Sequence, residues 1–292
     1  MNREQQQYGY TLIEVIVTIG ILGVVISLIV PSVQNARRAA DRTRCANNIK
    51  QLALALHNYE ATRGVLPPGR GGKAESVLSW LALSLPYLGQ EPLWKVSDQA
   101  VRETMVTYKN PPHVGYATVV PTFCCPSDSR LSSPLTTPSG DVAAFGTYLG
   151  VSRSFNQPGV LGGRQGVSIR AITDGASSTL LIGERPPPAS LQAGRWYSRR
   201  YILERFGGPD VLMSIPYSPT TLEDTQCRLA ASWYGPGRID NPCDRFHFWS
   251  EHGGGANFAF ADASVHYIKY EAASLLPALA SRAGGEVASV PE

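Results

Sequence analysis

Residues 9–31 read GYTLIEVIVTIGILGVVISLIVP, an apolar run with a single carboxylate, that of Glu14, near its start. The stretch from Tyr10 to Val30 is long enough to cross a bilayer core, which takes about 20 helical residues. A carboxylate in such a stretch costs about 3 kcal/mol at the membrane centre and less near the edge. We therefore expect Glu14 to have a partner, and the most direct one is a positive group on a neighbouring copy of the chain.

Helical spacing of apolar residues continues past Pro31, and the Gly-Pro-rich stretch that begins at Gly64 interrupts it. This pattern predicts one helix over about 10–61, with its first half in lipid and its amphipathic second half packed on a head. Pro31 has no amide hydrogen to donate, so we expect a kink there. We divide the chain into a leader (1–9), a transmembrane part (10–31), a stem (32–62), a head (63–282) and a flexible tail (283–292).

The rest of the chain has the composition of a folded body with alternating short strands and turns. Of the 292 residues 43% are hydrophobic, and a net charge of +3 is too small to indicate a nucleic-acid partner. We expect a short helix at 79–85, strands at 116–123, 145–151, 178–183, 229–234, 256–261 and 264–269, and loops at 126–141, 186–194 and 207–220. A helix followed by mostly antiparallel strands with long loop insertions predicts an α+β fold.

The five cysteines allow disulfides if the head lies outside the cytoplasm. Cys227 and Cys243 flank one polar loop and form a plausible local pair, and a bond from Cys45 to Cys125 would tie the stem to the head. Sequence alone leaves the connectivity open, and an odd count leaves at least one thiol unpaired or intermolecular. The absence of a C-x-x-C pair argues against a zinc ribbon.

The stretch GYTLIE at 9–14 resembles the cleavage and methylation signal of type IV prepilins and type II secretion pseudopilins. The resemblance implies that a membrane peptidase cuts after Gly9 and methylates the new amino terminus at Tyr10, where the family usually has Phe. It also makes Glu14 the fifth mature residue, which in the family governs assembly. The Glu14 carboxylate would neutralise the amino terminus of the next subunit.

Segments spread along the chain resemble a second group, the DUF1559 family of large pseudopilin-like proteins, abundant in planctomycetes. They are RCANNIKQL (44–52), ALHNY (55–59), LPPG (66–69), SWL (79–81), LPYL (85–88), FCCPSD (123–128), ITDGASST (172–179), IGE (182–184), HGGGANF (252–258) and FADASV (260–265). The resemblance implies a pilin-like fold with a long helix on a β-sheet head.

The last two of these segments resemble the family's C-terminal signature, a His followed ten residues later by Asp-Gly. His252 and Asp262 have that spacing, but Ala263 stands in place of Gly. We expect a hairpin with a two-residue turn at Asp262–Ala263, where a positive φ at Ala263 costs about 1 kcal/mol.

Other readings of the head are weaker. The HGGG stretch at 252–255 is found in esterases as an oxyanion hole, but the chain has no G-x-S-x-G elbow, so a glycine-rich turn before a strand is preferred. No spacing around His252, including His247 and Glu251, matches a zinc site. Asp174 and Asp262 are candidate ligands of a structural calcium ion, and Asp174–Gly175 is more simply a turn. For Glu184 we considered pairing with Arg185 or Arg195, or exposure to water.

We therefore interpret the chain as a structural, non-enzymatic prepilin-like subunit that requires no cofactor. Its expected partners are the prepilin peptidase/N-methyltransferase, other pilin or pseudopilin subunits and the cytoplasmic membrane. It would cross that membrane once, with its head outside the cytoplasm or in a cell-envelope fibre. The alternative is an anchored binding module that does not polymerise and that binds a glycan, a protein or calcium through its loops at 207–255.

Overall fold

The computed structural model describes residues 11–69, 77–154, 157–163, 165–198, 211–215, 227, 234–286 and 288. Helix α1 (Leu12–Arg63) opens the chain, as the sequence predicted. Gly64 has a φ of 77° and donates its N–H to the Glu60 carbonyl at 2.7 Å, the left-handed geometry with which glycine commonly ends a helix. Pro31 lies inside the helix, which continues beyond it, and the kink remains a prediction.

The chain divides into two compact units, Met1–Asp41 and Arg42–Glu292, and the boundary falls within the predicted stem. The described residues of the first unit are exposed up to Ala40. In the second unit, α1 is buried along one of its faces. The buried side chains recur every three or four residues and are Cys45, Ile49, Leu52, Ala53, Ala55 and Leu56.

The head of the second unit contains a mixed, mostly antiparallel sheet, as expected for an α+β fold. Its strands are β3 (Tyr148–Ser154), β4 (Gln157–Pro158), β5 (Leu180–Glu184), β6 (Leu212–Ile215), β7 (Gly255–Phe260) and β8 (Val265–Lys269). The strand order is β4-β3-β5-β7-β8, all antiparallel, and β6 pairs with β3 in parallel. A separate small ribbon joins β1 (Leu135–Thr136) to β2 (Val142–Ala143).

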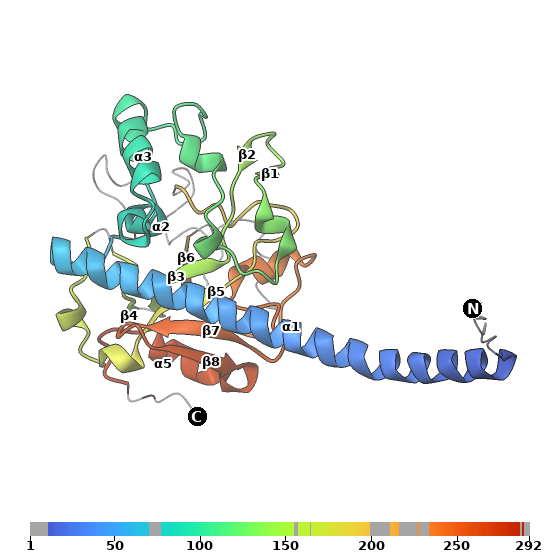
Figure 1. Cartoon of the computed structure of the whole chain (residues 1–292). Helices are drawn as coiled ribbons and strands as arrows, with labels where there is room; N and C mark the ends of the chain where they lie inside the picture. Colours follow the sequence, from blue (N-terminus) through green and yellow to red (C-terminus); the bar gives the residue numbers. More distant parts are fainter. Residues whose placement is uncertain are drawn as a thin grey trace, which may run out of the picture. The chain divides into compact units, whose positions relative to one another are not determined.

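Two hydrophobic clusters occupy opposite faces of this sheet, because alternate strand residues point to opposite sides. On β7, Ala259 belongs to the cluster that includes the buried residues of α1. Phe258 and Phe260 belong to the other cluster, with Leu276 and Leu279 of the short helix α5 (Leu276–Leu279). From Arg42 onward, α1 therefore lies across one face of the sheet and α5 lies on the other (Figure 1).

Two further helices pack on the head. Helix α2 (Trp80–Ser84) begins at an N-cap formed by Ser79, whose side chain accepts the Ala82 N–H at 3.1 Å. Helix α3 (Glu91–Glu103) was missed in the sequence. Its signals were Pro92 in the first turn and a buried stripe that includes Ser97, Ala100 and Val101.

Several predicted elements differ from the structure. Residues 116–123 do not form a strand: they contain the end of one 3-10 helix, Val114–Ala117, an irregular segment at 118–120 and a second 3-10 helix, Pro121–Phe123, which starts at a proline. The predicted loop at 126–141 contains a 3-10 helix, Ser129–Ser132, and β1. Strand β6 lies within the predicted loop 207–220. Only Tyr234 of the predicted strand 229–234 lies among the described residues, where it bridges to Phe248.

The β7–β8 hairpin is confirmed, but its turn is longer than expected. The Ala263 N–H bonds to the Phe260 carbonyl at 2.9 Å, and the Phe260 N–H bonds to the Ser264 carbonyl at 2.9 Å. The loop therefore has three residues, 261–263, and not two. Ala263 nevertheless has a φ of 66°, the left-handed position that closes such a loop and that glycine usually fills.

Candidate functional site

The amino-terminal candidate site begins with a reciprocal cap on α1. The Thr11 N–H and hydroxyl donate to Oε2 of Glu14 at 2.8 and 2.9 Å, and the Glu14 N–H faces the Thr11 hydroxyl at 3.4 Å. This is the capping box, which satisfies amides that a helix start leaves without partners. Glu14 is thus held in the first turn of α1. Gly9 and Tyr10 lie outside the described residues.

Between Glu14 and Pro31, helix α1 has apolar residues on all its sides. Its most apolar 18-residue window has a mean hydropathy of 2.8 and buries none of its residues. Among the described residues, α1 is the one helix that is long and apolar enough to cross a membrane. At about 1.5 Å per residue, 20 helical residues are about 30 Å long, which matches a bilayer core.

A second candidate site lies where α1 is fastened to the head. Cys45 of α1 forms a disulfide with Cys125, and the two Cα atoms are 5.1 Å apart. Cys227 forms a disulfide with Cys243, so the structure contains both pairs that were named from the sequence. The Cys45–Cys125 bond joins the buried face of the helix to the segment that follows the 3-10 helix Pro121–Phe123.

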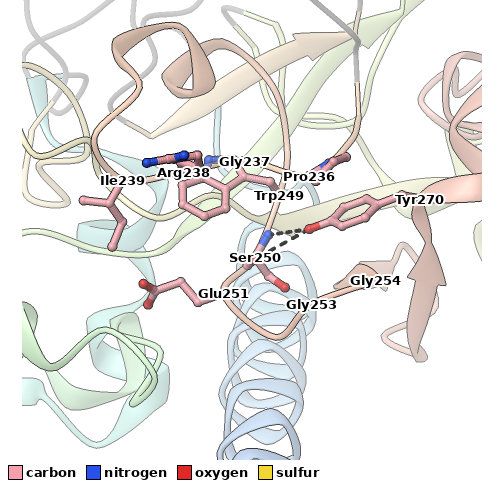
Figure 2. A pocket seen from close by; sticks show the side chains of 10 residues that line it. All are labelled: Pro236, Gly237, Arg238, Ile239, Trp249, Ser250, Glu251, Gly253, Gly254 and Tyr270. Atoms are coloured by element: carbon pink, nitrogen blue, oxygen red, sulfur yellow. Dashed lines mark hydrogen bonds between the residues drawn. The ribbon is translucent and has the colours of Figure 1, made fainter.

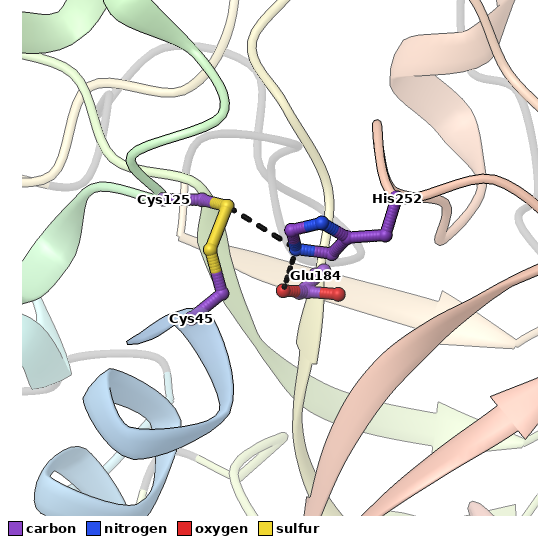
Figure 3. A group of neighbouring side chains, drawn as sticks. All are labelled: Cys45, Cys125, Glu184 and His252. Carbon is purple, nitrogen blue, oxygen red and sulfur yellow. Dashed lines mark hydrogen bonds and ion pairs between the residues drawn. A yellow bond between two sulfur atoms is a disulfide. The ribbon is translucent and has the colours of Figure 1, made fainter. Parts of the chain in front are cut away.

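Glu184 and His252 lie directly beside this disulfide (Figure 3). Nε2 of His252 is 3.4 Å from Oε1 of Glu184 and 3.4 Å from Sγ of Cys125. The side chains of His252 and Glu184 are 2% and 0% exposed. A buried carboxylate needs strong partners, and Glu184 also accepts the Asn257 N–H at 2.7 Å and its side-chain amide at 3.1 Å. Glu184 is therefore not exposed to water, contrary to one expectation.

The local sequence explains how His252 reaches this place. Gly253 and Gly254 have φ values of 70° and 76°, which L-residues rarely adopt, and Ser250 Oγ accepts the His252 N–H at 3.2 Å. A Cβ on Gly255 would lie 2.2 Å from the Ile268 carbonyl oxygen, so β7 can begin only with glycine there. The HGGG stretch is thus a turn that leads into a strand.

The other ring nitrogen of His252 faces a hydroxyl. Nδ1 lies 3.4 Å from Oγ of Ser127, so Ser127, His252 and Glu184 form a row. A nucleophilic serine needs a close hydrogen bond to its base and access for a substrate. The row provides a long contact and a buried ring, so we assign it a structural or ligand-holding role.

The signature residues His252 and Asp262 make different contacts. The Asp262 carboxylate accepts the Ser264 N–H at 2.8 Å and its hydroxyl at 2.7 Å inside the hairpin turn. The carbonyls of the same turn are bound by α1: Lys50 Nζ donates to Ala263 O at 2.7 Å, and His57 Nε2 lies 2.9 Å from Ala261 O. The turn around Asp262 therefore contacts α1 directly, whereas His252 lies beside the disulfide that joins α1 to the head.

The carboxylates of the two calcium candidates, Asp174 and Asp262, accept hydrogen bonds from backbone N–H groups. The Asp174 carboxylate accepts the N–H groups of Gly284 and Gly285 at 2.7 and 3.0 Å. Asp262 caps its own turn, as described above. Among the described residues, the group with three or more converging metal-ligating side chains is Cys45, Cys125, Glu184 and His252, and it includes neither aspartate.

Cys124 is the free thiol among the described cysteines, and it is next to a disulfide cysteine. Burial, and to a lesser extent the Asp128 carboxylate, raise the pKa of Cys124 to about 12. Only a thiolate attacks a disulfide. The raised pKa of Cys124 therefore disfavours the thiolate that exchange with the neighbouring Cys45–Cys125 bond would need.

A cavity of about 400 Å³ opens on the other side of the glycine turn (Figure 2). It is lined by Pro236, Gly237, Arg238, Ile239, Trp249, Ser250, Glu251, Gly253, Gly254 and Tyr270. Partial burial and then the Asp128 carboxylate raise the pKa of Glu251 to about 7. Trp249 is buried, and its indole N–H has no hydrogen-bond partner among the described residues. The cavity thus combines an aromatic wall with polar groups of both charges.

Comparison with known proteins gives two family matches. The family described as "Protein of unknown function (DUF1559)" matches residues 34–274. The "Prokaryotic N-terminal methylation motif" matches residues 5–30, which include Gly9, Tyr10 and Glu14. Glu184 and His252 both fall within the first match. Sequence reasoning singled out each of these two residues separately, but it did not bring them together.

Curated relatives match a shorter part. The chain is 36% identical over 70 residues to type II secretion system core protein G of Klebsiella michiganensis, which is 24% of this chain and 49% of that protein. The protein of the same name from Vibrio cholerae is 34% identical over 67 residues, 23% of this chain and 46% of that protein. The chain thus spans about half the length of the curated relatives it matches. No solved structure matches the chain.

Proposed function

The chain belongs to the family described as protein of unknown function (DUF1559), and it carries a prepilin methylation motif. On this basis we propose that it is a processed subunit of a pilus-like fibre. A prepilin peptidase would cut after Gly9 and methylate Tyr10. The mature chain would be held in the cytoplasmic membrane by the first half of α1, with its head outside. It would join, or associate with, a type II secretion pseudopilus or a type IV pilus-like fibre as a non-enzymatic part.

The observation that carries this proposal is a carboxylate at the start of a helix whose first half is apolar and exposed. The Glu14 carboxylate accepts hydrogen bonds from Thr11, and Glu14 follows by four positions the residue, Tyr10, where cleavage would leave an ammonium group. In an assembly, the Glu14 carboxylate of one subunit would pair with the terminal ammonium of another. That pairing would remove an uncompensated charge from lipid and set the axial register of the subunits.

The first test is the mass of the amino-terminal peptide of the protein purified from its own membranes. We expect a chain that starts at methylated Tyr10. A chain that still starts at Met1 would refute processing. Gly9→Ala is expected to leave the uncut form in the membrane.

The second test is Glu14→Ala, with Thr18→Ala as the matched control one turn further along the same helix. The Thr18 hydroxyl bonds to the Glu14 carbonyl, so the control changes a polar group of α1 and keeps the carboxylate. We expect Glu14→Ala to stay in the membrane and to be lost from sheared fibres, and Thr18→Ala to be incorporated normally. Equal incorporation of the two variants would contradict the assembly role.

The cavity beside the glycine turn favours a second candidate, the anchored binding module. Its aromatic and charged lining suits a small polar ligand. In this alternative the protein works without polymerising, so neither Glu14 nor cleavage at Gly9 matters for its activity. Trp249→Ala would then abolish the cellular role while Glu14→Ala preserved it, and the opposite pattern would exclude the binding module.

A further inference from the structure

We propose that the side chains of Cys45, Cys125, Glu184 and His252 form a zinc site when the disulfide is reduced. The four ligand atoms lie within 4.8 Å of one another, and they come from four separate parts of the sequence. Two thiolates, an imidazole and a carboxylate are ligands that Zn²⁺ takes in four-coordinate sites. The proposal is independent of fibre assembly.

Two of the distances between ligand atoms already fit a tetrahedral site. Tetrahedral zinc, with bonds of about 2.0–2.1 Å to nitrogen or oxygen and about 2.3 Å to sulfur, puts nitrogen and oxygen about 3.3 Å apart and sulfur and nitrogen about 3.6 Å apart. In the structure, His252 Nε2 lies 3.4 Å from Glu184 Oε1 and 3.4 Å from Cys125 Sγ. Once the disulfide is open, the two sulfur atoms must move apart to take separate corners of the tetrahedron.

Neighbouring groups favour the His252 tautomer and the Glu184 orientation that metal binding needs. Ser127 Oγ lies 3.4 Å from Nδ1 of His252, so a proton on Nδ1 leaves Nε2 free to bind metal. The Asn257 N–H and side-chain amide fix the Glu184 carboxylate. Such outer contacts orient metal ligands and raise affinity. Gly253 and Gly254, which follow His252 in the sequence, are exposed to solvent.

The chemistry balances with a dithiol as reductant. The dithiol gives two electrons and two protons to the Cys45–Cys125 bond and becomes a disulfide itself, which leaves two cysteine thiols. Zinc then displaces both thiol protons to water and binds two thiolates, Glu184 and neutral His252. The metal and the disulfide are therefore alternative ways to fasten α1 to the head, one for reducing and one for oxidising surroundings.

The test uses the full chain in detergent with Cys227→Ser and Cys243→Ser, so that the other disulfide contributes no thiols. The protein is reduced with a dithiol, and the dithiol is then removed under anaerobic conditions. The reduced protein is titrated with Co²⁺ and then with Zn²⁺. We expect one metal per chain, thiolate-to-cobalt absorption with the visible bands of a tetrahedral site, and displacement of cobalt by zinc. The unreduced protein should bind neither metal.

Two further variants on the same background decide whether the named side chains are the ligands. His252→Gln should weaken zinc binding at least about tenfold. His247→Gln is the matched control: this buried histidine contacts Asp244 at 3.1 Å, outside the cluster, and the variant should bind as before. Circular dichroism of each reduced sample reports folding, and zinc should refold any sample that reduction unfolds.

Three results would overturn the proposal. They are a reduced protein that takes up no metal whether folded or not, equal binding by the oxidised chain, and a His252→Gln variant that binds like its background.

Discussion

The two halves of α1 have similar apolar side chains and opposite surroundings. In the first half Ile16 and Leu22 are 59% and 53% exposed, whereas in the second half Ile49 and Leu52 are 0% exposed. Periodicity explains part of the difference, because the second half has apolar residues at helical spacing along the face that it buries. The first half is apolar all round, a pattern that suits lipid or other helices and not a water-covered head.

The second half also has polar attachments that the first half lacks among the described residues. Asn48 donates to the Cys124 carbonyl at 2.9 Å, and Lys50 and His57 bind the turn of the β7–β8 hairpin. The disulfide at Cys45 adds a covalent bond. The comparison teaches that the second half of α1 is part of the folded head, whereas the described residues of the first half are exposed. Each attachment of the second half can be removed by substitution to test this difference.

The largest effect is expected from the disulfide. Cys45 and Cys125 are 80 residues apart, and the chain-entropy estimate for such a loop is about 4.5 kcal/mol of unfolding free energy. We expect Cys45→Ala with Cys125→Ala to lose about that much in urea unfolding, followed by fluorescence of the buried tryptophans. Removing the Cys227–Cys243 bond, with a separation of 16, should cost about 3 kcal/mol. A smaller loss at Cys45–Cys125 than at Cys227–Cys243 would contradict the fastening of α1.

Next comes a matched pair of leucines. Leu52→Ala opens a cavity in the head and should lower the free energy of unfolding by about 2–5 kcal/mol. Leu22→Ala, in the exposed half, should change it by less than about 0.5 kcal/mol. Both are measured by urea unfolding of the full chain in detergent. Equal losses would mean that the two halves form one folding unit.

A third, smaller effect tests the polar attachment. Lys50→Met keeps most of the side-chain length and removes the bond to the Ala263 carbonyl, so a loss of about 1 kcal/mol is expected. Lys95→Met is the control, because Lys95 lies on α3 in an exposed ion pair with Glu91 at 3.7 Å. The prediction fails if the two variants unfold at the same urea concentration.

The smallest effect should be a gain. Ala263 occupies a left-handed conformation that glycine adopts without penalty. Ala263→Gly is therefore expected to raise the free energy of unfolding by about 0.5–1 kcal/mol and to leave the contacts of Lys50 and His57 intact. Thermal unfolding measures the change, and a decrease in the midpoint would show that the turn is not strained.

The elements with strong local signals were predictable from the sequence. Helix α1, its end at Gly64 and the β7–β8 hairpin follow from periodicity and turn residues. Residues 116–123 were wrongly predicted as a strand because their apolar character was given more weight than the proline at 121. Helix α3 was missed although its buried stripe has helical spacing.

The candidate sites also differ in whether their residues are close together in the sequence. The methylation motif was predictable because one carboxylate in an apolar run is conspicuous within a few residues, and the assembly role of Glu14 stays a prediction. The cluster at the disulfide was not, because its members at 45, 125, 184 and 252 meet only through the tertiary fold. Glu184 precedes a buried arginine in the sequence, which suggested a local ion pair instead of the contact with His252.

The contacts between α1 and the β7–β8 turn also govern the order in which the chain can be completed during synthesis. His57 leaves the ribosome 204 residues before Ala261, whose carbonyl it contacts. At about 5–20 residues per second, that interval is roughly 10–40 s. Throughout it the apolar face from Cys45 to Leu56 has no hairpin to cover it. The nascent head therefore passes through a stage in which part of its apolar surface is exposed and prone to aggregation.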